Sequence, residues 1–417
     1  TGRIMDPGRE VAVVGVIIGY ARSNGVRSAA AGPALAPDRR RGYHPAMRVG
    51  IDYLPAVTHA PGRGRYAREL VRALCLLELD DVDLRLFEIG RGPRRFSGAA
   101  LGLDQARFRV KRRRSKLPRR VVEWVDRIVG LGADGWLGGC DVFHHTSPVL
   151  PPVGNALEIL PIAELPPEGS PEESKLREGA QRMARVVVFS QHYASEVPRR
   201  LGVDPKVVRM THVGCGHWRR SLETLPARDE KPYMLALGCP RDDRRPELLL
   251  AALEVLLRER PETRLVIAGS AGAQAERFER KLAFSVARNA VEWRRTPSEA
   301  ELPAIVARAS CVVHLAREEG TPVTGLEALS MGTPVVASRI PAFVEALQGD
   351  AAYVDLERVE ERPALLAEAV LKAFAEADDA TRVRRRIQRA SAFTWLRTAS
   401  ETLDVWRDAV HDVPPED

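Results

Sequence analysis

The stretch that decides the fold runs over residues 312–338 and reads V-V-H-L-A-R-E-E-G-T-P-V-T-G-L-E-A-L-S-M-G-T-P-V-V-A-S. Residues 311–315 are apolar and β-branched without alternation, which is typical of a parallel strand buried on both faces. A helix is predicted over residues 322–331, because proline is well tolerated in a first helical turn and a glycine directly follows. A second buried strand is predicted over residues 334–337. This order of strand, turn, helix and strand predicts an α/β fold.

Two glutamates frame the turn between this strand and this helix. Glu319 precedes the helix, and Glu327 lies inside it eight positions later. In α/β folds ligands bind at the carboxyl ends of strands, and a helix N-terminus suits a phosphate. A carboxylate repels phosphate but accepts hydrogen bonds from hydroxyl groups, so Glu319 suits a sugar and Glu327 suits a ribose. The alternative is structural: an acid at a helix N-terminus and a half-buried acid whose hydrogen bonds are satisfied.

These residues also resemble a known family. The segment E-E-G-T-P-V-T-G-L-E-A-L-S-M-G-T-P-V-V-A-S, residues 318–338, is similar to the E-x7-E signature of retaining nucleotide-sugar glycosyltransferases of the GT-B fold, the group 1 family. The match includes both glutamates, and it departs at Thr321-Pro322 and at Thr324. The resemblance implies two Rossmann-like, doubly wound α/β domains that face a cleft, with the nucleotide-sugar on the second domain and the acceptor on the first.

The donor site implied by the resemblance lies on the second domain. The family places an Arg directly after the glycine that ends the first strand of this domain and a Lys five residues later; here these positions are Cys239 and Arg244. Arg241, Arg244 or Arg245 could supply the charge, since arginine binds phosphate in a fork; a solvated basic loop is the alternative. Glu319 and Arg244 are assigned to catalysis. The residues assigned to the donor are Gly238, Arg241, Arg244, Glu319, Gly320, Thr321, Pro322, Val323 and Glu327.

The acceptor side is predicted on the first domain. The loop T-H-A-P-G-R-G-R-Y, residues 58–66, follows a strand and resembles the G-x-G-R-Y of the family at the cleft. A tight turn with no ligand is the alternative. His144 is also assigned to the cleft, because adjacent histidines in D-V-F-H-H point to opposite faces of a strand. The His-Asp pair of the family is replaced here by Ala163 and Glu164, which is a departure at the acceptor site. The residues assigned to the acceptor and cleft are Gly62, Gly64, Arg65, Tyr66 and His144.

The alternation of strands and helices predicts the domain organisation. A first Rossmann-like domain is predicted over 47–216, a linker over 217–231 and a second domain over 232–392. A terminal helix with a tail, 393–417, is expected to cross back to the first domain. Residues 1–46 are interpreted as a disordered or translated upstream extension. Their apolar run is too short to span a bilayer, which needs about 20 residues, and a signal-peptide core is the alternative.

The charge distribution argues against nucleic-acid binding. The 417 residues carry a net charge of +7, of which residues 1–46 hold +4 (seven Arg against three acids), leaving +3 on the rest. A near-neutral body gives little support for nucleic-acid binding. The five cysteines are scattered without paired metal spacing. They favour reduced thiols in a cytoplasmic protein without a metal site.

One segment of this near-neutral body is strongly basic. Residues 111–120, K-R-R-R-S-K-L-P-R-R, hold seven basic side chains and precede an amphipathic stretch. Such a cluster can contact an anionic membrane surface. The alternative is a solvated charge run. The predicted location is therefore cytoplasmic, with peripheral contact at the inner membrane face as one interpretation.

The function predicted from the resemblance is transfer of a sugar, with retention, from a nucleoside diphosphate sugar to a glycan, a lipid-linked acceptor or a small molecule. Neither a metal nor a further cofactor is expected. One alternative is a non-catalytic GT-B protein that binds a nucleotide or a partner, which the three altered motifs favour. A further alternative is a sugar-nucleotide epimerase.

Overall fold

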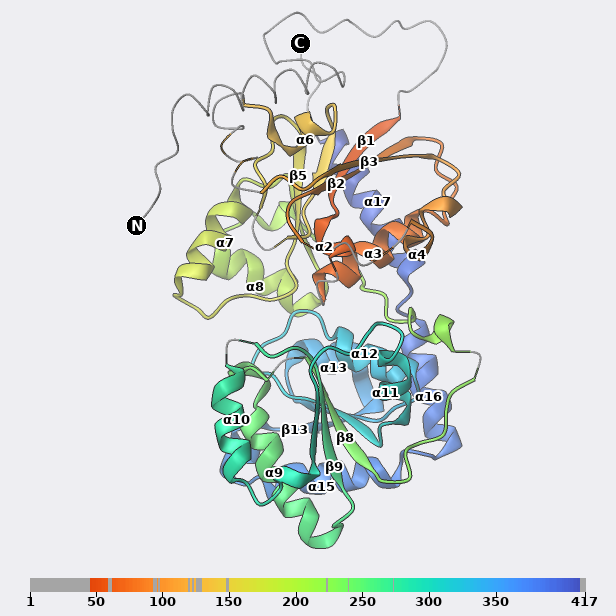
Figure 1. The fold of residues 1–417 in the computed structure, drawn as a ribbon. Coiled ribbons are helices and arrows are strands. Elements are labelled where there is room, and N and C mark those ends of the chain that lie inside the picture. The colour runs from red at the N-terminus through yellow and green to blue at the C-terminus, as the bar shows by residue number, and fades with distance from the viewer. Residues whose placement is uncertain are drawn as a thin grey trace, which may run out of the picture.

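The computed structural model describes residues 46–412 apart from residues 59–61, 93–95, 97, 119–120, 122–123, 125–129, 148–149, 223, 239 and 273. This part of the chain forms two α/β bodies, one stacked on the other (Figure 1). Residues 1–45 of the predicted extension and Cys239 lie outside the described residues, as does most of the amphipathic stretch after the basic run.

The first body is built on a parallel sheet that has seven strands in the described ranges, in the order β3-β2-β1-β4-β5-β6-β7. The strands are β1 (Met47–Asp52), β2 (Val82–Ile89), β3 (Arg109–Ser115), β4 (Val142–His144), β5 (Leu157–Pro161), β6 (Arg185–Val188) and β7 (Val208–Met210). The helices are α2 (Leu54–Val57), α3 (Arg63–Leu74), α4 (Gly98–Leu101), α6 (Gly132–Trp136), α7 (Pro171–Gln181) and α8 (Gln191–Leu201). The strand order reverses between β1 and β4, which makes the sheet doubly wound.

The second body repeats this plan with six parallel strands in the described part of the chain, in the order β10-β9-β8-β11-β12-β13. The strands are β8 (Tyr233–Leu237), β9 (Arg264–Ala268), β10 (Val291–Arg294), β11 (Cys311–His314), β12 (Val335–Ser338) and β13 (Ala351–Val354). The helices are α9 (Pro246–Glu259), α10 (Ala275–Phe284), α11 (Leu302–Arg308), α12 (Val323–Ser330), α13 (Pro341–Leu347), α14 (Leu356–Glu361), α15 (Ala364–Ala375) and α16 (Ala380–Ser391). Here the order reverses between β8 and β11.

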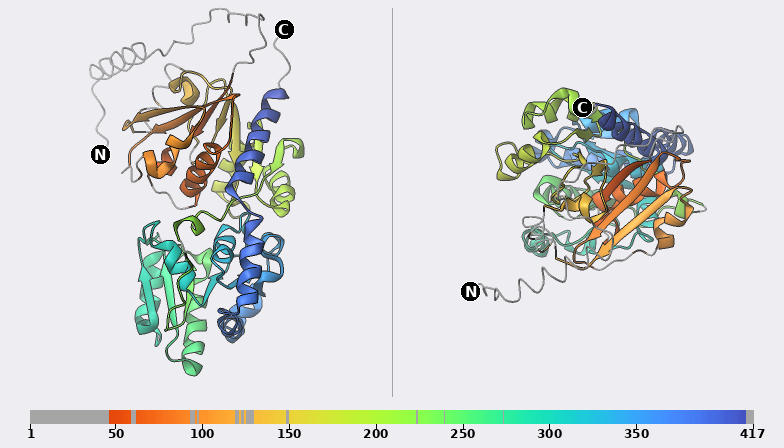
Figure 2. Two further views of the ribbon diagram at one scale, coloured as in Figure 1. Left: turned by 90° about the vertical axis from the view of Figure 1, so that its right-hand side faces the viewer. Right: turned by 90° about the horizontal axis from the view of Figure 1, so that it is seen from above.

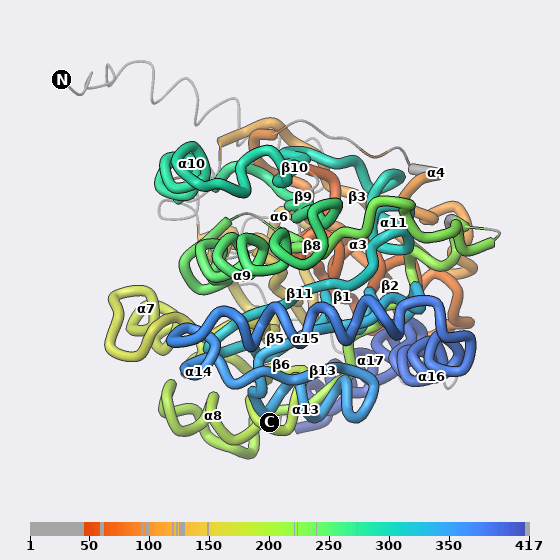
Figure 3. Tube along the Cα trace, turned by 90° about the horizontal axis from the view of Figure 1, so that it is seen from below, coloured from red at the N-terminus to blue at the C-terminus, as the bar shows by residue number. Residues whose placement is uncertain are grey.

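Helices cover both faces of the second sheet, which is why inner strands such as β12 are apolar without alternation, whereas the edge strand β10 reads V-E-W-R. Leu253 of α9 and Val370 of α15 are buried in one core, and Val306 of α11 and Leu326 of α12 are buried in another. Seen from below, α9 and α15 lie side by side across the sheet (Figure 3). The predicted strands over 311–315 and 334–337 and the predicted helix over 322–331 correspond to β11, β12 and α12, so the doubly wound α/β prediction is confirmed.

The last helix, α17 (Trp395–His411), leaves the second body and packs on the first. Figure 2 shows it running along the upper body, above α16. Its Leu403 and Trp406 are buried in the same apolar core as Ile51 of β1 and Leu70 of α3. Burial of this apolar surface fixes the end of the chain to the first sheet.

The first half of the basic run, residues 111–115, lies in a strand that the sequence analysis did not predict. Residues 111–114 lie in β3, at the edge of the first sheet. Arg112 Nε lies 2.5 Å from Glu88 Oε1, and Arg114 Nε lies 3.4 Å from Glu88 Oε2, so β2 supplies a buried acid for two of the arginines. This pairing allows a charged segment to join a sheet. Among the described helices, none combines the length and the apolarity needed to cross a bilayer.

Candidate functional site

The predicted donor residues converge at the carboxyl ends of β8 and β11, where the strand order of the second sheet reverses. Gly238 follows β8 with a φ of 105°, a conformation that favours glycine. The turn after β11 carries Glu319 and leads into α12, which lies at the top of the lower body and faces the upper one (Figure 1). This is the edge of a doubly wound sheet at which ligands bind.

The first turn of α12 has the properties of an anion site. Pro322 is its N-cap residue, and no described side chain caps the helix. The N–H groups of a first helical turn have no partner within the helix, and the helix dipole is positive at this end. Gly320 and Thr321 complete the turn and are buried. These features are the basis of the predicted phosphate site, but the N–H of Val323 already donates to the carbonyl oxygen of Thr321 at 2.8 Å.

Glu319 is joined to Arg244, the second residue assigned to catalysis. Arg244 Nη1 donates to Glu319 Oε2 at 2.6 Å, and it also donates to Nε2 of His314. Only 7% of the Glu319 side chain is exposed. Burial by itself would raise the pKa of this carboxyl, but Arg244 and His314 hold the pKa below its usual value. Glu319 is therefore an ionised, buried hydrogen-bond acceptor.

Arg244 also reaches across to the first body. Its Nη2 lies 3.3 Å from Oε1 of Glu164, and Nη2 of Arg241 lies 3.6 Å from the same oxygen. Glu164 stands where the family carries part of its His-Asp pair. The acid at that position therefore contacts the two arginines predicted to bind a diphosphate.

Glu327 is joined to the first body as well. Arg65 Nη1 donates to Glu327 Oε1 at 2.8 Å, and Arg65 Nη2 lies 3.4 Å from Oε1 of Glu299. The Glu299 carboxylate also accepts a hydrogen bond from Arg68 at 3.0 Å. Burial raises the pKa of Glu327 to about 7, although the charge of Arg65 acts in the opposite direction. The carboxyl predicted to bind ribose is thus half of a buried ion pair between the two bodies.

His217 lies beside this pair. Its Nε2 is 3.3 Å from Glu327 Oε1, without hydrogen-bond geometry, and its Nδ1 accepts a hydrogen bond from Trp395 Nε1 at 3.2 Å. Burial, together with Arg65 and other nearby arginines, holds the pKa of His217 well below its usual value. A neutral imidazole beside Glu327 adds no charge to the site.

The assignment of His144 to the cleft is wrong. His144 is fully buried, its Nδ1 accepts from Trp406 Nε1 at 3.2 Å, and its Nε2 lies 3.2 Å from the Tyr66 hydroxyl. Burial lowers the pKa of His144 to about 3. The neighbouring His145 is also buried and pairs with Glu158 at 2.7 Å. The alternation along β4 was read correctly, but α17 and β5 supply partners for both rings.

The remaining residues of the predicted loop lie at the start of α3. Gly62 is the N-cap residue of α3 with a φ of 65°, and Gly64 is buried in its first turn. Arg65, in the same turn, faces the second body, whereas the ring of Tyr66 packs against Phe189 and Trp395. Of the described residues of this loop, Arg65 therefore contacts the acids of the second body, and Tyr66 belongs to the core.

The first body covers the start of α12 in this arrangement. A Cβ added to Gly320 would lie 2.1 Å from Cε2 of Tyr193, and the Thr321 hydroxyl lies 3.5 Å from the carbonyl oxygen of Ala163. Val323 packs against the core of the first body. The mouth of the helix, which the sequence analysis predicted to face a ligand, is thus closed by protein.

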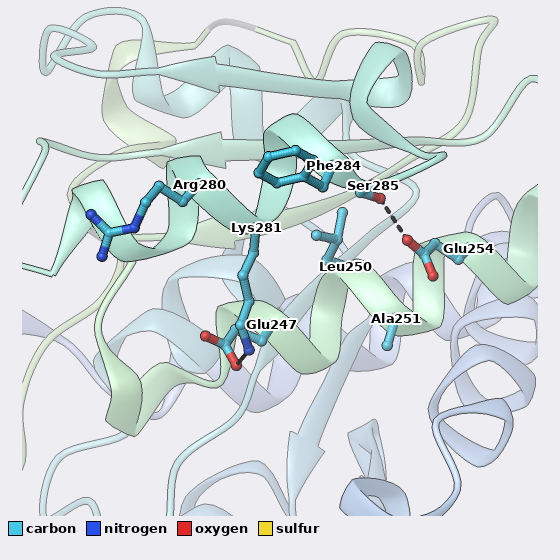
Figure 4. Close-up of a pocket in the computed structure, with 8 residues that line it drawn as sticks. All are labelled: Glu247, Leu250, Ala251, Glu254, Arg280, Lys281, Phe284 and Ser285. Atoms are coloured by element: carbon cyan, nitrogen blue, oxygen red, sulfur yellow. Dashed lines mark hydrogen bonds and ion pairs between the residues drawn. The ribbon is translucent and has the colours of Figure 1, made fainter.

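An open pocket of about 460 Å³ lies elsewhere, between α9 and α10. Figure 4 shows its lining, with Phe284 and Arg280 from α10 on one side and Leu250 and Glu254 from α9 on the other. None of the predicted donor or acceptor residues lines it. Within the described ranges, no three His, Cys, Asp or Glu side chains are grouped as a metal ion would require.

Sequence reasoning missed several residues that surround the two glutamates. His314 contacts Glu319, Glu299 binds two arginines of α3, and His217 lies beside Glu327. A signal existed for His314 alone, because it is the last residue of a predicted buried strand and so lies at the ligand-binding edge. Nothing local marks Glu299, whose partners are more than 200 positions away.

Comparison with solved structures defines the class of fold. A sucrose-phosphate synthase of Thermosynechococcus elongatus aligns with a TM-score of 0.64 and 17% identity, covering 88% of this chain and all of that one. The Anabaena protein HepE, solved with UDP and glucose, aligns with a TM-score of 0.61 and 12% identity over the same shares. Together with the two doubly wound sheets, these likenesses define a GT-B protein.

Comparison of sequences then shows which family the second body resembles. Residues 219–389 match the model of the glycosyl transferases group 1. A GDP-mannose:cellobiosyl-diphosphopolyprenol alpha-mannosyltransferase of Xanthomonas oryzae pv. oryzae is 29% identical over 39% of this chain and 43% of its own length. A D-inositol 3-phosphate glycosyltransferase of Streptomyces scabiei is 27% identical over 55% of this chain and 54% of its own length. The chain thus spans about half the length of the curated relatives it matches.

Proposed function

We propose that this chain transfers a sugar from a nucleoside diphosphate sugar to a hydroxyl acceptor, with retention at the anomeric carbon. The observation that carries the proposal is the contact between Arg244 and Glu319, 2.6 Å long, beside the uncapped start of α12. A cation, a helix N-terminus and an ionised acceptor of hydroxyl hydrogen bonds are thereby gathered at the edge of the sheet where its strand order reverses.

In this proposal each group has one task. Arg244, with Arg241, binds the diphosphate together with the first N–H groups of α12, and this positive charge stabilises the leaving phosphate. Glu319 accepts hydrogen bonds from the transferred sugar, and Glu327 accepts them from the ribose. In the same-face mechanism associated with the family, the leaving phosphate takes the proton of the acceptor. The arrangement then needs no metal ion, no further cofactor and no histidine in the role of a base.

Entry of the donor requires the two bodies to separate. In the closed arrangement Arg65 is paired with Glu327, and Glu164 contacts Arg244. The ring of Tyr193 covers Gly320. The contacts of Glu164 and Arg65 are ion pairs, which water and a diphosphate can replace. Opening exposes the turn before α12. Arg65 then leaves Glu327, and Arg244 leaves Glu164.

The names of relatives support a nucleotide-sugar donor. The Xanthomonas relative is named as a GDP-mannose enzyme, and HepE was solved with UDP and with UDP-glucose. The proposed acceptor is a glycan, a lipid-linked sugar or a small molecule. For a lipid-linked acceptor, the exposed Arg114 in β3 and Lys116 directly after it would contact anionic lipid at the cytoplasmic face.

The experiment is a binding screen followed by a turnover assay. Thermal shift is measured with UDP, GDP and ADP and with their sugars. The melting temperature is expected to rise with the nucleotides of one base and not with those of the other two. Turnover of the matching donor, measured as nucleoside diphosphate release, is expected to depend on an added acceptor. If no nucleoside diphosphate stabilises the wild-type chain, the proposal fails.

The closed helix mouth favours a second candidate, a GT-B protein that binds a nucleotide or partner without catalysis. Both glutamates of the signature are already neutralised by arginines, and Glu164 adds an acid beside the predicted phosphate site. The two candidates differ in one measurement. A binder of this kind would be stabilised by a nucleotide but would neither transfer nor hydrolyse any donor sugar.

A further inference from the structure

A buried arginine of the first body reaches the residue directly before Glu319. Arg200 lies in α8, and only 3% of its side chain is exposed. Its Nη1 donates to both carboxylate oxygens of Glu318, at 2.8 and 2.9 Å. The two residues are 118 positions apart in the sequence, so this contact joins the first body to the turn before α12.

The rest of the Arg200 guanidinium is held within the first body. Its Nε donates to Oε1 of Glu173 at 2.8 Å, and its Nη2 donates to the carbonyl oxygen of Pro166. Glu173 is itself fixed, since its Oε2 accepts from the N–H of Gly169 at 2.7 Å. Because these bonds hold the planar guanidinium in one orientation, its free edge is in position before the two bodies meet.

Two other residues of α8 contact the second body nearby. The Tyr193 hydroxyl lies 3.4 Å from Oε1 of Glu318, and its ring lies against Gly320. At the start of α8, the N–H of Gln191 donates to both oxygens of Glu345, at 2.9 and 3.0 Å. A carboxylate of α13 therefore binds the positive end of α8. Helix α8 of the first body thus contacts the segment around Glu319 through Tyr193 and Arg200.

We propose that Arg200 is a positioning residue that acts through Glu318. When the bodies close, Nη1 of Arg200 fixes the Glu318 carboxylate, and the backbone that Glu318 shares with Glu319 is fixed with it. Arg200 keeps Glu173 when the bodies open, and Glu318, whose side chain is 35% exposed, returns to water. The contact is therefore made at closure without leaving a buried charge unpaired in the open state. The role of Glu319 in this proposal rests on the proposed function. The contact between Arg200 and Glu318 does not depend on it.

The first test measures closure and needs no activity. Glu318→Ala is compared with the wild type and with Glu360→Ala. Glu360 has a similar exposed fraction, 31%, and its partners Arg245 and Arg317 belong to its own body. Hydrogen exchange of the amides over 163–165 and 318–325 is expected to rise about tenfold in Glu318→Ala, as for the loss of a close charge pair. It is expected to stay unchanged in Glu360→Ala, and unchanged exchange in Glu318→Ala would overturn the proposal.

The second test separates positioning from binding. In Glu318→Ala, kcat for the matching donor is expected to fall about tenfold, while the Kd for the nucleoside diphosphate changes less than about threefold. Glu318→Asp, which keeps the charge, is expected to recover part of kcat. An unaltered kcat in Glu318→Ala overturns the positioning role. If the wild type binds no nucleotide, the proposed function fails, and the positioning role fails with it. Unchanged hydrogen exchange in Glu318→Ala instead overturns the contact between Arg200 and Glu318. The two failures are therefore distinguishable.

Discussion

Nη1 of Arg65 lies 2.8 Å from Oε1 of Glu327, although the two residues are 262 positions apart in the sequence. Only 13% of the arginine side chain and 2% of the glutamate side chain are exposed. Arg65 was predicted to serve the acceptor side and Glu327 the nucleotide. Because they contact each other, the proposed binding of a ribose by Glu327 requires Arg65 to leave this carboxylate first.

Replacement of Glu327 tests its role in nucleotide binding. Glu327→Gln is expected to weaken binding of the preferred nucleoside diphosphate about tenfold or more, since a hydrogen bond to a charged group is worth roughly 1.5–3 kcal/mol. Calorimetry should show the loss with the ribonucleotide but not with its 2′,3′-dideoxy analogue, which lacks both hydroxyls. Glu301→Gln, a change at an exposed glutamate that binds the N–H of Ser298, is the control. Equal affinity of wild type and Glu327→Gln for the ribonucleotide would show that Glu327 does not bind it.

The raised pKa of Glu327 predicts a pH dependence of stability. Its pKa is about 7 in the folded chain and 4.5 when unperturbed, chiefly because of burial. The folded state therefore binds the proton more tightly, so this group stabilises the fold below pH 4.5, and that contribution is lost as the pH rises through 7. Glu327→Gln should remove a decline of up to about 3 kcal/mol between pH 5 and 8. Denaturant unfolding of both proteins at the two pH values measures the difference, and parallel curves would contradict it.

Replacement of Arg244 tests the diphosphate site. Arg244→Gln removes the cation beside Glu319 and α12, and it is expected to lower kcat/KM for the donor about a hundredfold. Arg244→Lys should recover only part of this, because lysine cannot form the fork. Arg277→Gln provides the control, since Arg277 is 54% exposed and pairs with Asp242 and Glu247 outside the site. A kcat/KM of Arg244→Gln equal to that of the control would remove Arg244 from the site.

The contact between Gly320 and Tyr193 predicts that Gly320→Ala hinders closure. The added methyl would lie 2.1 Å from a carbon of the Tyr193 ring, so one of the two bodies must move. Overpacking of this kind typically costs about 1–3 kcal/mol. Small-angle X-ray scattering should show a larger radius of gyration for Gly320→Ala, and the double variant Gly320→Ala with Tyr193→Ala should return to the wild-type value. A compact single variant would contradict the expectation.

His144 is expected to affect stability and not binding. His144→Ala leaves the Trp406 indole N–H without its acceptor in the core, and the free energy of unfolding should fall by about 3 kcal/mol. Because the folded-state pKa is about 3 and the usual value is 6.5, the unfolded chain takes up the proton first. The wild type should therefore lose stability as the pH falls from 6.5 toward 3, and the variant should lose less. A changed nucleotide affinity in a folded His144→Ala protein would return His144 to the site.

The local part of the fold was predictable from sequence. Residues 311–337 read as strand, helix and strand, and the structure has β11, α12 and β12 there. Strand β3 was not predictable in this way, because Lys and Arg carry no apolar periodicity. What makes it a strand is β2, whose Glu88 neutralises two of its arginines.

The same division applies to the candidate site. The sequence by itself determined that Glu319 and Glu327 flank the start of a helix at a ligand-binding edge, since apolar periodicity and helix signals act over a few residues. Only the tertiary structure decided that Arg244 neutralises Glu319, that Arg65 neutralises Glu327 and that His144 turns to the core. Ion pairs between distant residues depend on how two sheets and a returning helix pack. Burial then fixes which charges must be paired, and no local pattern contains that information.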